Sequence, residues 1–324
     1  MQILLLIASL FFATVPIVGF LVVIWWLDRY DREPIWLVAL TFGWGAVGSI
    51  ILALIGSFIL NLPFELALSP EAADGIGATF IAPLVEEPSK ALFLLAIYFS
   101  RHFDNTTDGF VYGAAAGLGF AMTENFMYFT SVGSTGDMVA YAGTVVIRTL
   151  YSAMMHACAS SVVGASLGFV KFRSLPFKLV VPPVGLAVAM GIHALWNGLL
   201  TLEGVAEASG MLALLNFLIF PLEFLGLFIT LQVCLQIEKR TIRRELDEEA
   251  RLGVLPGSLV PILSSYLPRG RAGWVPKGVS KDDYIVAATT LAFRKHQHRN
   301  RPDPGIAEDI ERLRGQLRAW SALA

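Results

Sequence analysis

Two adjacent carboxylates and two histidines lie within long apolar stretches of this 324-residue sequence. Glu86 and Glu87 occur in PLVEEPSKAL, Glu124 in FAMTENFMY, His156 in SAMMHACAS and His193 in GIHALWNG. Carboxylates and imidazoles together activate water, either by taking its proton directly or by holding a divalent metal that lowers the pKa of bound water. Both alternatives are hydrolytic. The sequence therefore predicts catalytic roles for Glu86, Glu87, His156 and His193, with or without a metal such as Zn²⁺.

The composition indicates that these residues belong to a membrane protein. Hydrophobic residues make up 55% of the chain and charged residues 15%, and the mean hydropathy is +0.64. An ionisable side chain in the hydrocarbon core costs about 2.5 kcal/mol or more, so each one indicates a functional site. The net charge of -2 gives no indication of a nucleic-acid partner.

Seven apolar runs are long enough to cross a bilayer as helices. The predicted fold is an all-α polytopic bundle of about seven transmembrane helices with a C-terminal tail. The first run lacks the basic residues and the cleavage pattern of a removable signal peptide, so we expect it to remain as an anchor. The predicted spans cover residues 3–27, 35–60, 76–99, 109–131, 142–170, 180–201 and 211–236.

Positive charges predict the orientation of the bundle. Lys and Arg occur in the connections at 28–34, 100–108 and 171–178, and again after Glu238. The alternate connections, near 61–75, 132–141 and 202–210, contain neither residue type. The positive-inside rule then places the N-terminus outside and the C-terminus in the cytoplasm, in the cytoplasmic (inner) membrane.

The chain divides by composition into two parts. Residues 1–237 form the predicted transmembrane domain, with a polar core in 76–201, and residues 238–324 form a partly helical cytoplasmic tail to which no activity is assigned. Two tail helices are expected near 281–298 and 305–320. His296 and His298 lie among basic residues, which favours a solvated basic face over a metal tract.

Depth in the membrane decides whether the polar groups meet. With a helical rise of 1.5 Å per residue, the two glutamates lie roughly 15 Å below the outer face, Glu124 about 10 Å, His156 about 20 Å and His193 about 12 Å. Pairs four residues apart share a helix face, such as Glu86 with Lys90 and His193 with Asn197. Pro83 and Pro88 remove backbone hydrogen bonds, so a kinked, wet helix is expected around one polar cavity.

Other polar residues are predicted to support this site: Lys90, Glu124, Arg148 and Asn197. A metal would be held by His156, His193 and Glu124. Simpler interpretations also exist, because Glu86 and Lys90 could form a structural ion pair and an intramembrane histidine can join two helices by a hydrogen bond. Ser166 lies in a G-x-S-x-G sequence, but within a helix that pattern indicates small-residue packing, and we expect no catalytic role for it.

The ordered motifs resemble those of a known family. Residues 86–90 read E-E-x-x-K, residues 120–128 read F-x-x-x-E-x-x-x-Y, and Arg148 with His156 and His193 with Asn197-Gly198 follow in successive spans. Together they resemble the PrsW family of intramembrane proteases, which is related to the CAAX prenyl endopeptidases and bacteriocin-immunity membrane proteins. Lys90 lies one residue earlier than the arginine of the CAAX endopeptidases, and Glu124 replaces their usual histidine, which favours PrsW.

The resemblance implies an enzyme that cleaves a membrane-anchored protein, such as an anti-sigma factor, within the lipid bilayer. It implies essential roles for Glu86, Glu87, His156 and His193. The alternative is a proton-coupled transporter, because chains of Glu and His also relay protons across membranes. Transporters often contain two matching halves. The polar spans here are consecutive and occur once, which favours the enzyme.

Overall fold

The computed structural model describes residues 2–28, 30, 32–100, 102–206, 210–271, 273–300 and 302–323, and these ranges contain helices and no strand. The chain forms two compact units. One comprises Met1–Leu27 and Glu33–Thr230, and the other comprises Asp28–Arg32 and Leu231–Ala324. The helix α10 (Met211–Arg251) contributes residues to both units.

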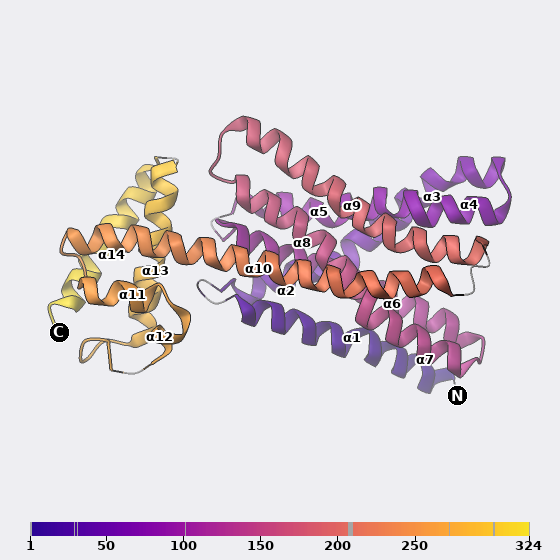
Figure 1. Ribbon diagram of the computed structural model, residues 1–324, viewed down its shortest axis with the longest axis horizontal. Helices are drawn as coiled ribbons and strands as arrows, with labels where there is room; N and C mark the ends of the chain where they lie inside the picture. Colours follow the sequence, from indigo (N-terminus) through magenta and orange to yellow (C-terminus); the bar gives the residue numbers. More distant parts are fainter. Residues whose placement is uncertain are drawn as a thin grey trace. The chain divides into compact units, whose positions relative to one another are not determined.

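The first unit is a bundle of long helices that run beside one another (Figure 1). Three short π-helical segments, named η1 to η3, continue directly into α-helices on either side. The elements before α10 are α1 (Gln2–Leu27), α2 (Ile35–Gly43), η1 (Trp44–Ser49), α3 (Ile50–Ala67), α4 (Pro70–Ile76), η2 (Gly77–Ile81), α5 (Ala82–Ile97), α6 (Thr106–Ser134), α7 (Met138–Ile147), η3 (Arg148–Ser152), α8 (Ala153–Val170) and α9 (Leu175–Ala206).

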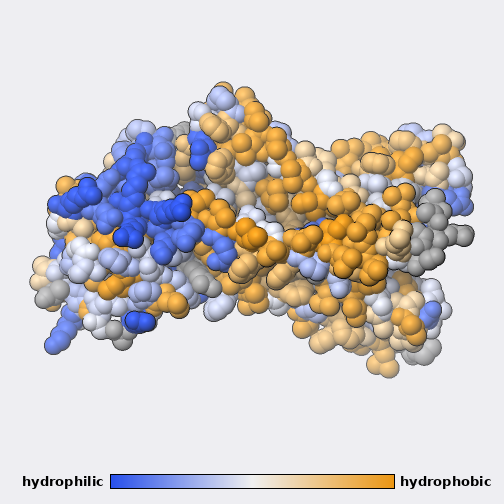
Figure 2. Space-filling model, in the orientation of Figure 1, coloured by the Kyte–Doolittle hydropathy of each residue, from blue (hydrophilic) through white to orange (hydrophobic). Residues whose placement is uncertain are grey.

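Apolar side chains cover the exposed face of this unit (Figure 2), as expected for helices in contact with lipid. Among the described helices, five are long and apolar enough to cross a membrane: Gln2–Leu27, Ile35–Ala67, Met138–Val170, Leu175–Gly204 and Leu214–Arg251. The chain is therefore an all-α integral membrane protein. The two other predicted spans coincide with α5 and α6, which carry the charged residues, so the count of seven remains a prediction.

Helices α6 and α8 approach each other at backbone distance because glycines face the contact. A Cβ atom added to Gly117 would lie 2.2 Å from the carbonyl oxygen of His156, and one added to Gly113 would lie 2.2 Å from that of Ser160. Small residues allow this kind of close helix packing in membranes. The same contact explains Gly164, in the G-x-S-x-G sequence, whose Cβ would meet the carbonyl oxygen of Gly109 at 1.8 Å.

The π-helical segments leave backbone carbonyls that side chains of other helices satisfy. Thr123 donates to the carbonyl of Ala46 in η1 at 2.7 Å. Asn197 donates to that of Ala78 in η2 at 2.9 Å, and Asn125 to that of Arg148 in η3 at 3.3 Å. π-Helical segments often occur at functional sites.

The η2 segment also explains how Pro83 is accommodated. The N–H of Ala82 donates to Gly77, five residues earlier, so the next residue would donate to Ala78 in the same register. Pro83 has no N–H, and Asn197 supplies the missing donor. The chain widens into η2 before Pro83, and α5 continues through Pro88, so the kink at the prolines stays a prediction.

The second unit has a hydrophobic core of its own. The predicted tail helices coincide with α13 (Lys281–Asn300) and α14 (Pro304–Ser321), and the shorter elements are η4 (Gly257–Leu259), α11 (Val260–Leu263) and α12 (Tyr266–Gly270). Side chains such as Leu246, Leu291 and Leu317 are fully buried together, and Tyr30 packs against them. The tail is thus more compact than the modest helical content expected from its sequence.

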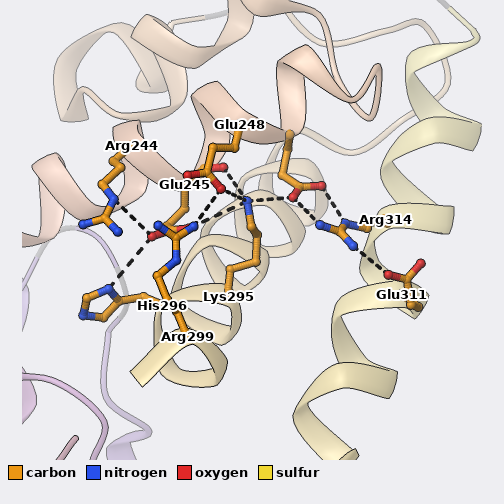
Figure 3. Close-up of polar contacts among 9 residues, drawn as sticks. Arg244, Glu245, Glu248, Lys295, His296, Arg299, Glu311 and Arg314 are labelled. Atoms are coloured by element: carbon orange, nitrogen blue, oxygen red, sulfur yellow. Dashed lines mark hydrogen bonds and ion pairs between the residues drawn. The ribbon is translucent and has the colours of Figure 1, made fainter. Parts of the chain in front are cut away.

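A network of ion pairs joins α10, α13 and α14 beside this core (Figure 3). The ammonium of Lys295 lies 2.7 Å from Glu249 and 3.3 Å from Glu248. Arg314 forms two hydrogen bonds with the Glu249 carboxylate, of 2.8 and 2.7 Å. Lys295 is buried, so part of the predicted solvated basic face instead packs against the carboxylates of α10.

Candidate active site

The predicted site residues come from successive helices and converge inside the first unit. Helix α5 supplies Glu86, Glu87 and Lys90, α8 supplies His156 and α9 supplies His193. Glu86, Glu87, His156 and His193 each offer a ligand atom, and these atoms lie within 4.8 Å of one another. The convergence expected from helical depth is therefore present in the structure.

Glu87 is the most enclosed carboxylate of the site, with its side chain wholly buried. One of its oxygens, Oε1, lies 2.7 Å from Nζ of Lys90 and 2.9 Å from Nδ1 of His193. Its other oxygen lies 3.5 Å from the hydroxyl of Ser160. A buried carboxylate requires such partners, and they fix Glu87 in one orientation.

The ammonium of Lys90 lies among the acidic and imidazole groups. Besides Glu87, it contacts Nδ1 of His156 at 2.9 Å and Oε2 of Glu86 at 3.5 Å. It also lies 4.0 Å from the centre of the Phe120 ring, a cation–π contact. Lys90 is completely buried, so its charge is balanced inside the protein by the adjacent carboxylates.

The contacts of His156 define its tautomer when the ring is neutral. Lys90 has only donors, so Nδ1 of His156 accepts from it. The other nitrogen, Nε2, lies 2.8 Å from Oε2 of Glu124 and then carries the hydrogen that it donates. In the same way, Nδ1 of His193 donates to Glu87, which leaves the lone pair of His193 on Nε2.

Glu124 lies on the far side of His156 from Lys90. Its Oε2 atom accepts from His156 and from Arg148, the latter at 2.6 Å. Arg148 also donates to Asn125 at 3.1 Å and lies 3.7 Å from the centre of the Tyr128 ring. Arg148 thus neutralises the charge of Glu124 beside the cluster.

Glu86 is held less tightly than Glu87. Its side chain is 12% exposed, whereas that of Glu87 is fully buried. Its two ionic neighbours are distant, with Lys90 at 3.5 Å and His193 at 3.9 Å. Of the two adjacent carboxylates, Glu86 is therefore the one with access and freedom to meet a water molecule.

The carboxylate oxygens and imidazole nitrogens of the four converging residues are suitable ligands for a divalent metal. Two imidazoles with one or two carboxylates form a ligand set typical of catalytic zinc. Glu124, which the sequence predicts as a ligand, is not a member of this group. It instead accepts from the ring nitrogen of His156 that points away from Lys90, the usual place for a carboxylate that orients a histidine ligand.

Asn197, which the sequence predicts as a supporting residue, lies apart from the cluster, and so does Ser166, for which no catalytic role is expected. Asn197 bonds to η2 rather than to the carboxylates or histidines. Ser166 donates to the carbonyl of Val163, and ten helical residues place it about 15 Å along α8 from His156.

Sequence reasoning missed Ser160 and Asn125. Ser160 follows His156 by four residues, and that spacing on a helix could have indicated it. Asn125 is next to Glu124 in the sequence but packs on a different face, and it is recognisable only from its contacts with Arg148.

Apolar helices that enclose two glutamates and two histidines are the arrangement that an intramembrane hydrolase requires. The model of the PrsW family of intramembrane metalloproteases matches residues 33–223, which contain every residue of this cluster. The chain belongs to this family, as its motifs predicted, and is an intramembrane peptidase.

Curated relatives carry the same family name. Protease PrsW of Bacillus subtilis (strain 168) is 28% identical over 199 residues, which cover 60% of this chain and 81% of that protein. Protease PrsW of Oceanobacillus iheyensis is 30% identical over 173 residues, with coverage of 52% and 72%. Protease PrsW of Clostridioides difficile (strain 630) is 35% identical over 120 residues, with coverage of 36% and 49%. No solved structure matches the chain.

Proposed function

We propose that this chain hydrolyses a peptide bond in a membrane-anchored protein substrate with water activated by Glu86, Glu87, His156 and His193. The observation that carries the proposal is the convergence of their ligand atoms within 4.8 Å inside an apolar helix bundle. Family membership supports peptide-bond hydrolysis over the proton-coupled transport that the same residue types could perform.

Glu86 acts as the general base in this proposal. Its carboxylate takes a proton from water as the water oxygen attacks the carbonyl carbon of the substrate, and then returns the proton to the leaving amide nitrogen. Glu87 has a different role, because Lys90 and His193 occupy the same oxygen of its carboxylate. It holds His193 with Nδ1 protonated and Nε2 available at the site.

A divalent metal would be held by His156 and His193 with a carboxylate of Glu86 or Glu87. Bound there, it would lower the pKa of water and polarise the substrate carbonyl. Glu124 fixes the hydrogen on Nε2 of His156, so that the Nδ1 lone pair faces the cluster. Lys90 competes for that lone pair, and its ammonium must move before Nδ1 can serve as a ligand.

The proposed substrate is a protein anchored in the same bilayer, such as an anti-sigma factor. We place the enzyme in the cytoplasmic membrane with its N-terminus outside and its C-terminal tail in the cytoplasm, which the distribution of Lys and Arg supports. The transmembrane domain, residues 1–237, carries the activity, and the tail, residues 238–324, is outside the active site.

The proposal is tested with the full-length protein reconstituted in vesicles with a tagged single-span substrate. Cleavage by the wild type and by Ser166→Ala, together with its loss in Glu86→Gln and His193→Ala, is expected. Chelation followed by addition of Zn²⁺ tests the metal separately. Full cleavage by both Glu86→Gln and His193→Ala would refute the assignment, and uptake of a solute coupled to protons without any cleavage would favour the transporter.

A further inference from the structure

The second unit contains a pocket of about 430 Å³ that neither the peptidase site nor the hydrophobic core explains. Its wall is formed by the connection between α1 and α2, by the short helix α12 and by the start of α13. The polar and aromatic residues that line it are Tyr30, Arg32, Tyr266, Arg269, Lys281 and Asp282.

Three cations and one carboxylate line the pocket, so its charge is positive. Arg269 is 7% exposed, and its guanidinium lies 4.9 Å from the ring of Tyr30 and 5.7 Å from that of Tyr266. These are cation–π contacts, which attract the guanidinium to the two rings. Lys281 donates to the carbonyl of Gly270 at 3.0 Å, which places its ammonium at the pocket edge.

Opposing contributions act on the pKa of Arg269. Burial lowers the pKa of its guanidinium, and the like charge of Arg32 lowers this pKa as well. Tyr30, Tyr266 and the carboxylate of Glu238 act in the opposite direction. The charges of Arg269 and Arg32 are close enough to interact, so both would attract an anion in the pocket.

Part of the pocket wall lies in the connection between two candidate membrane helices. Arg32 belongs to the short connection between α1, which ends at Leu27, and α2, which begins at Ile35, and both helices are apolar enough to enter the bilayer. Two of the lining residues are large, apolar and exposed: Leu267 is 75% exposed and Val286 is 62% exposed. Apolar side chains beside clustered cations are typical of surfaces that contact anionic lipid.

We propose that this pocket binds the phosphate group of an anionic phospholipid, with Arg32, Arg269 and Lys281 as its ligands. Guanidinium groups suit phosphate because they present several donors in one plane. A free phosphate compound offers the same chemistry, and the experiment separates the two sources. The proposal is independent of the peptidase reaction, because none of these residues belongs to the catalytic cluster.

The test uses the full-length protein in detergent, with phosphatidylglycerol titrated and bound lipid counted by native mass spectrometry. Arg32→Gln and Lys281→Gln are suitable because both substitutions remove the positive charge, keep a polar side chain and avoid the buried Arg269. Each should weaken binding by about fivefold, the effect of one basic residue near an anionic surface. Lys277→Gln is the matched control, since Lys277 is an exposed lysine of the same unit that does not line the pocket.

A second arm identifies the source of the phosphate. Glycerol 1-phosphate and inorganic phosphate are added at millimolar concentration to the protein loaded with phosphatidylglycerol. Retention of the lipid supports recognition of a membrane lipid, and its displacement supports a soluble phosphate compound in the same pocket. Equal binding of phosphatidylglycerol by Arg32→Gln, Lys281→Gln and Lys277→Gln would overturn the proposal, as would equal binding of phosphatidylcholine by the wild type.

Discussion

The side-chain nitrogen of Lys90 and Nδ1 of His156 lie 2.9 Å apart, although the two residues are 66 positions apart in the chain. The ammonium therefore occupies the lone pair that His156 would offer to a metal. The Lys90 ammonium and a metal ion would then compete for Nδ1 of His156, and this competition can be measured.

Replacing Lys90 with Met should increase the affinity for a divalent metal by about tenfold or more. Two unit charges 4 Å apart interact by about 4 kcal/mol at an effective dielectric constant of 20, so loss of the ammonium removes a large repulsion. The measurement is a titration of purified protein with Co²⁺, followed by its absorption bands. Lys178→Met serves as the control. A weaker affinity in Lys90→Met would mean that the ammonium organises the ligands instead of excluding the metal.

The two adjacent glutamates should respond differently to substitution by Gln. Glu86→Gln should lower turnover by about 100-fold or more at unchanged thermal stability, because it removes the proposed base from a loosely held position. Glu87→Gln should lower both turnover and melting temperature, because Glu87 holds Lys90 and His193 together. Combining Glu86→Gln with His193→Ala should add little to the loss of activity if the residues act as one unit.

Gly117→Ala should destabilise the bundle and displace His156. The added methyl group would lie 2.2 Å from the carbonyl oxygen of His156, so α6 and α8 must separate. We expect a cost of about 1–3 kcal/mol, as for other overpacked sites, together with loss of most cleavage activity. Gly143→Ala is the matched control, because its Cβ position has no described atom within 4 Å apart from its chain neighbours and the backbone of its own helix. Thermal melting in detergent distinguishes the two variants.

The second unit should lose stability in acid. Burial alone would raise the pKa of Glu249, but hydrogen bonds from Arg314 and Lys295, and their charges, hold it below its ordinary value. A carboxyl group with a lowered folded-state pKa contributes stability that is complete above its unfolded pKa of about 4.3 and is lost as pH falls through the folded-state pKa.

Hydrogen exchange of α13 and α14 in the full-length protein, measured from about pH 7 down to about pH 3, tests this expectation. Arg314→Gln should reduce protection by about 1.5–3 kcal/mol at neutral pH, because it removes the charged hydrogen bonds of Arg314 and leaves Lys295 to pair with the buried Glu249 carboxylate, and should flatten the pH dependence. Arg312→Gln is the control, since Arg312 pairs with the exposed Asp309 within α14. Equal protection in both variants would contradict the structural role of the Arg314 pair.

Reporter fusions test the orientation. Fusions after Asn61, Gly133 and Glu203 should report the exterior, and fusions after Asp104, Arg173 and Glu245 the cytoplasm. A consistent reversal at one fusion site would change the number of spans.

The sequence predicts the convergence of the catalytic candidates because each lies on a long apolar helix whose depth follows from its length. Glu86, His156 and His193 are therefore expected at a similar depth in the bundle, where their side chains can contact one another. The spacing of Glu86 and Lys90 also predicts a shared face. The spacing of residues along each helix and the thickness of the membrane are thus sufficient to predict that a polar core exists.

Contacts between helices were beyond prediction from one sequence. The contact between Glu124 and Nε2 of His156 depends on the rotation of α6 about its axis relative to α8. The glycines between these helices are compatible with several such rotations, so the sequence alone does not select one. The three π-helical segments depend on donors from other helices, such as Thr123 and Asn197. The compact tail was underestimated for a similar reason, since Tyr30 reaches its core from far away in the sequence.

The packing of Tyr30 against the C-terminal core fixes the parity of the membrane crossings. Tyr30 packs against a core formed by residues within 242–317, so these two parts of the chain must be on the same side of the bilayer. The chain between them therefore crosses an even number of times. The candidate spans in that interval, Ile35–Ala67, Met138–Val170, Leu175–Gly204 and Leu214–Arg251, satisfy this condition. It follows that α5 and α6 either both traverse the bilayer or both enter and leave on one face.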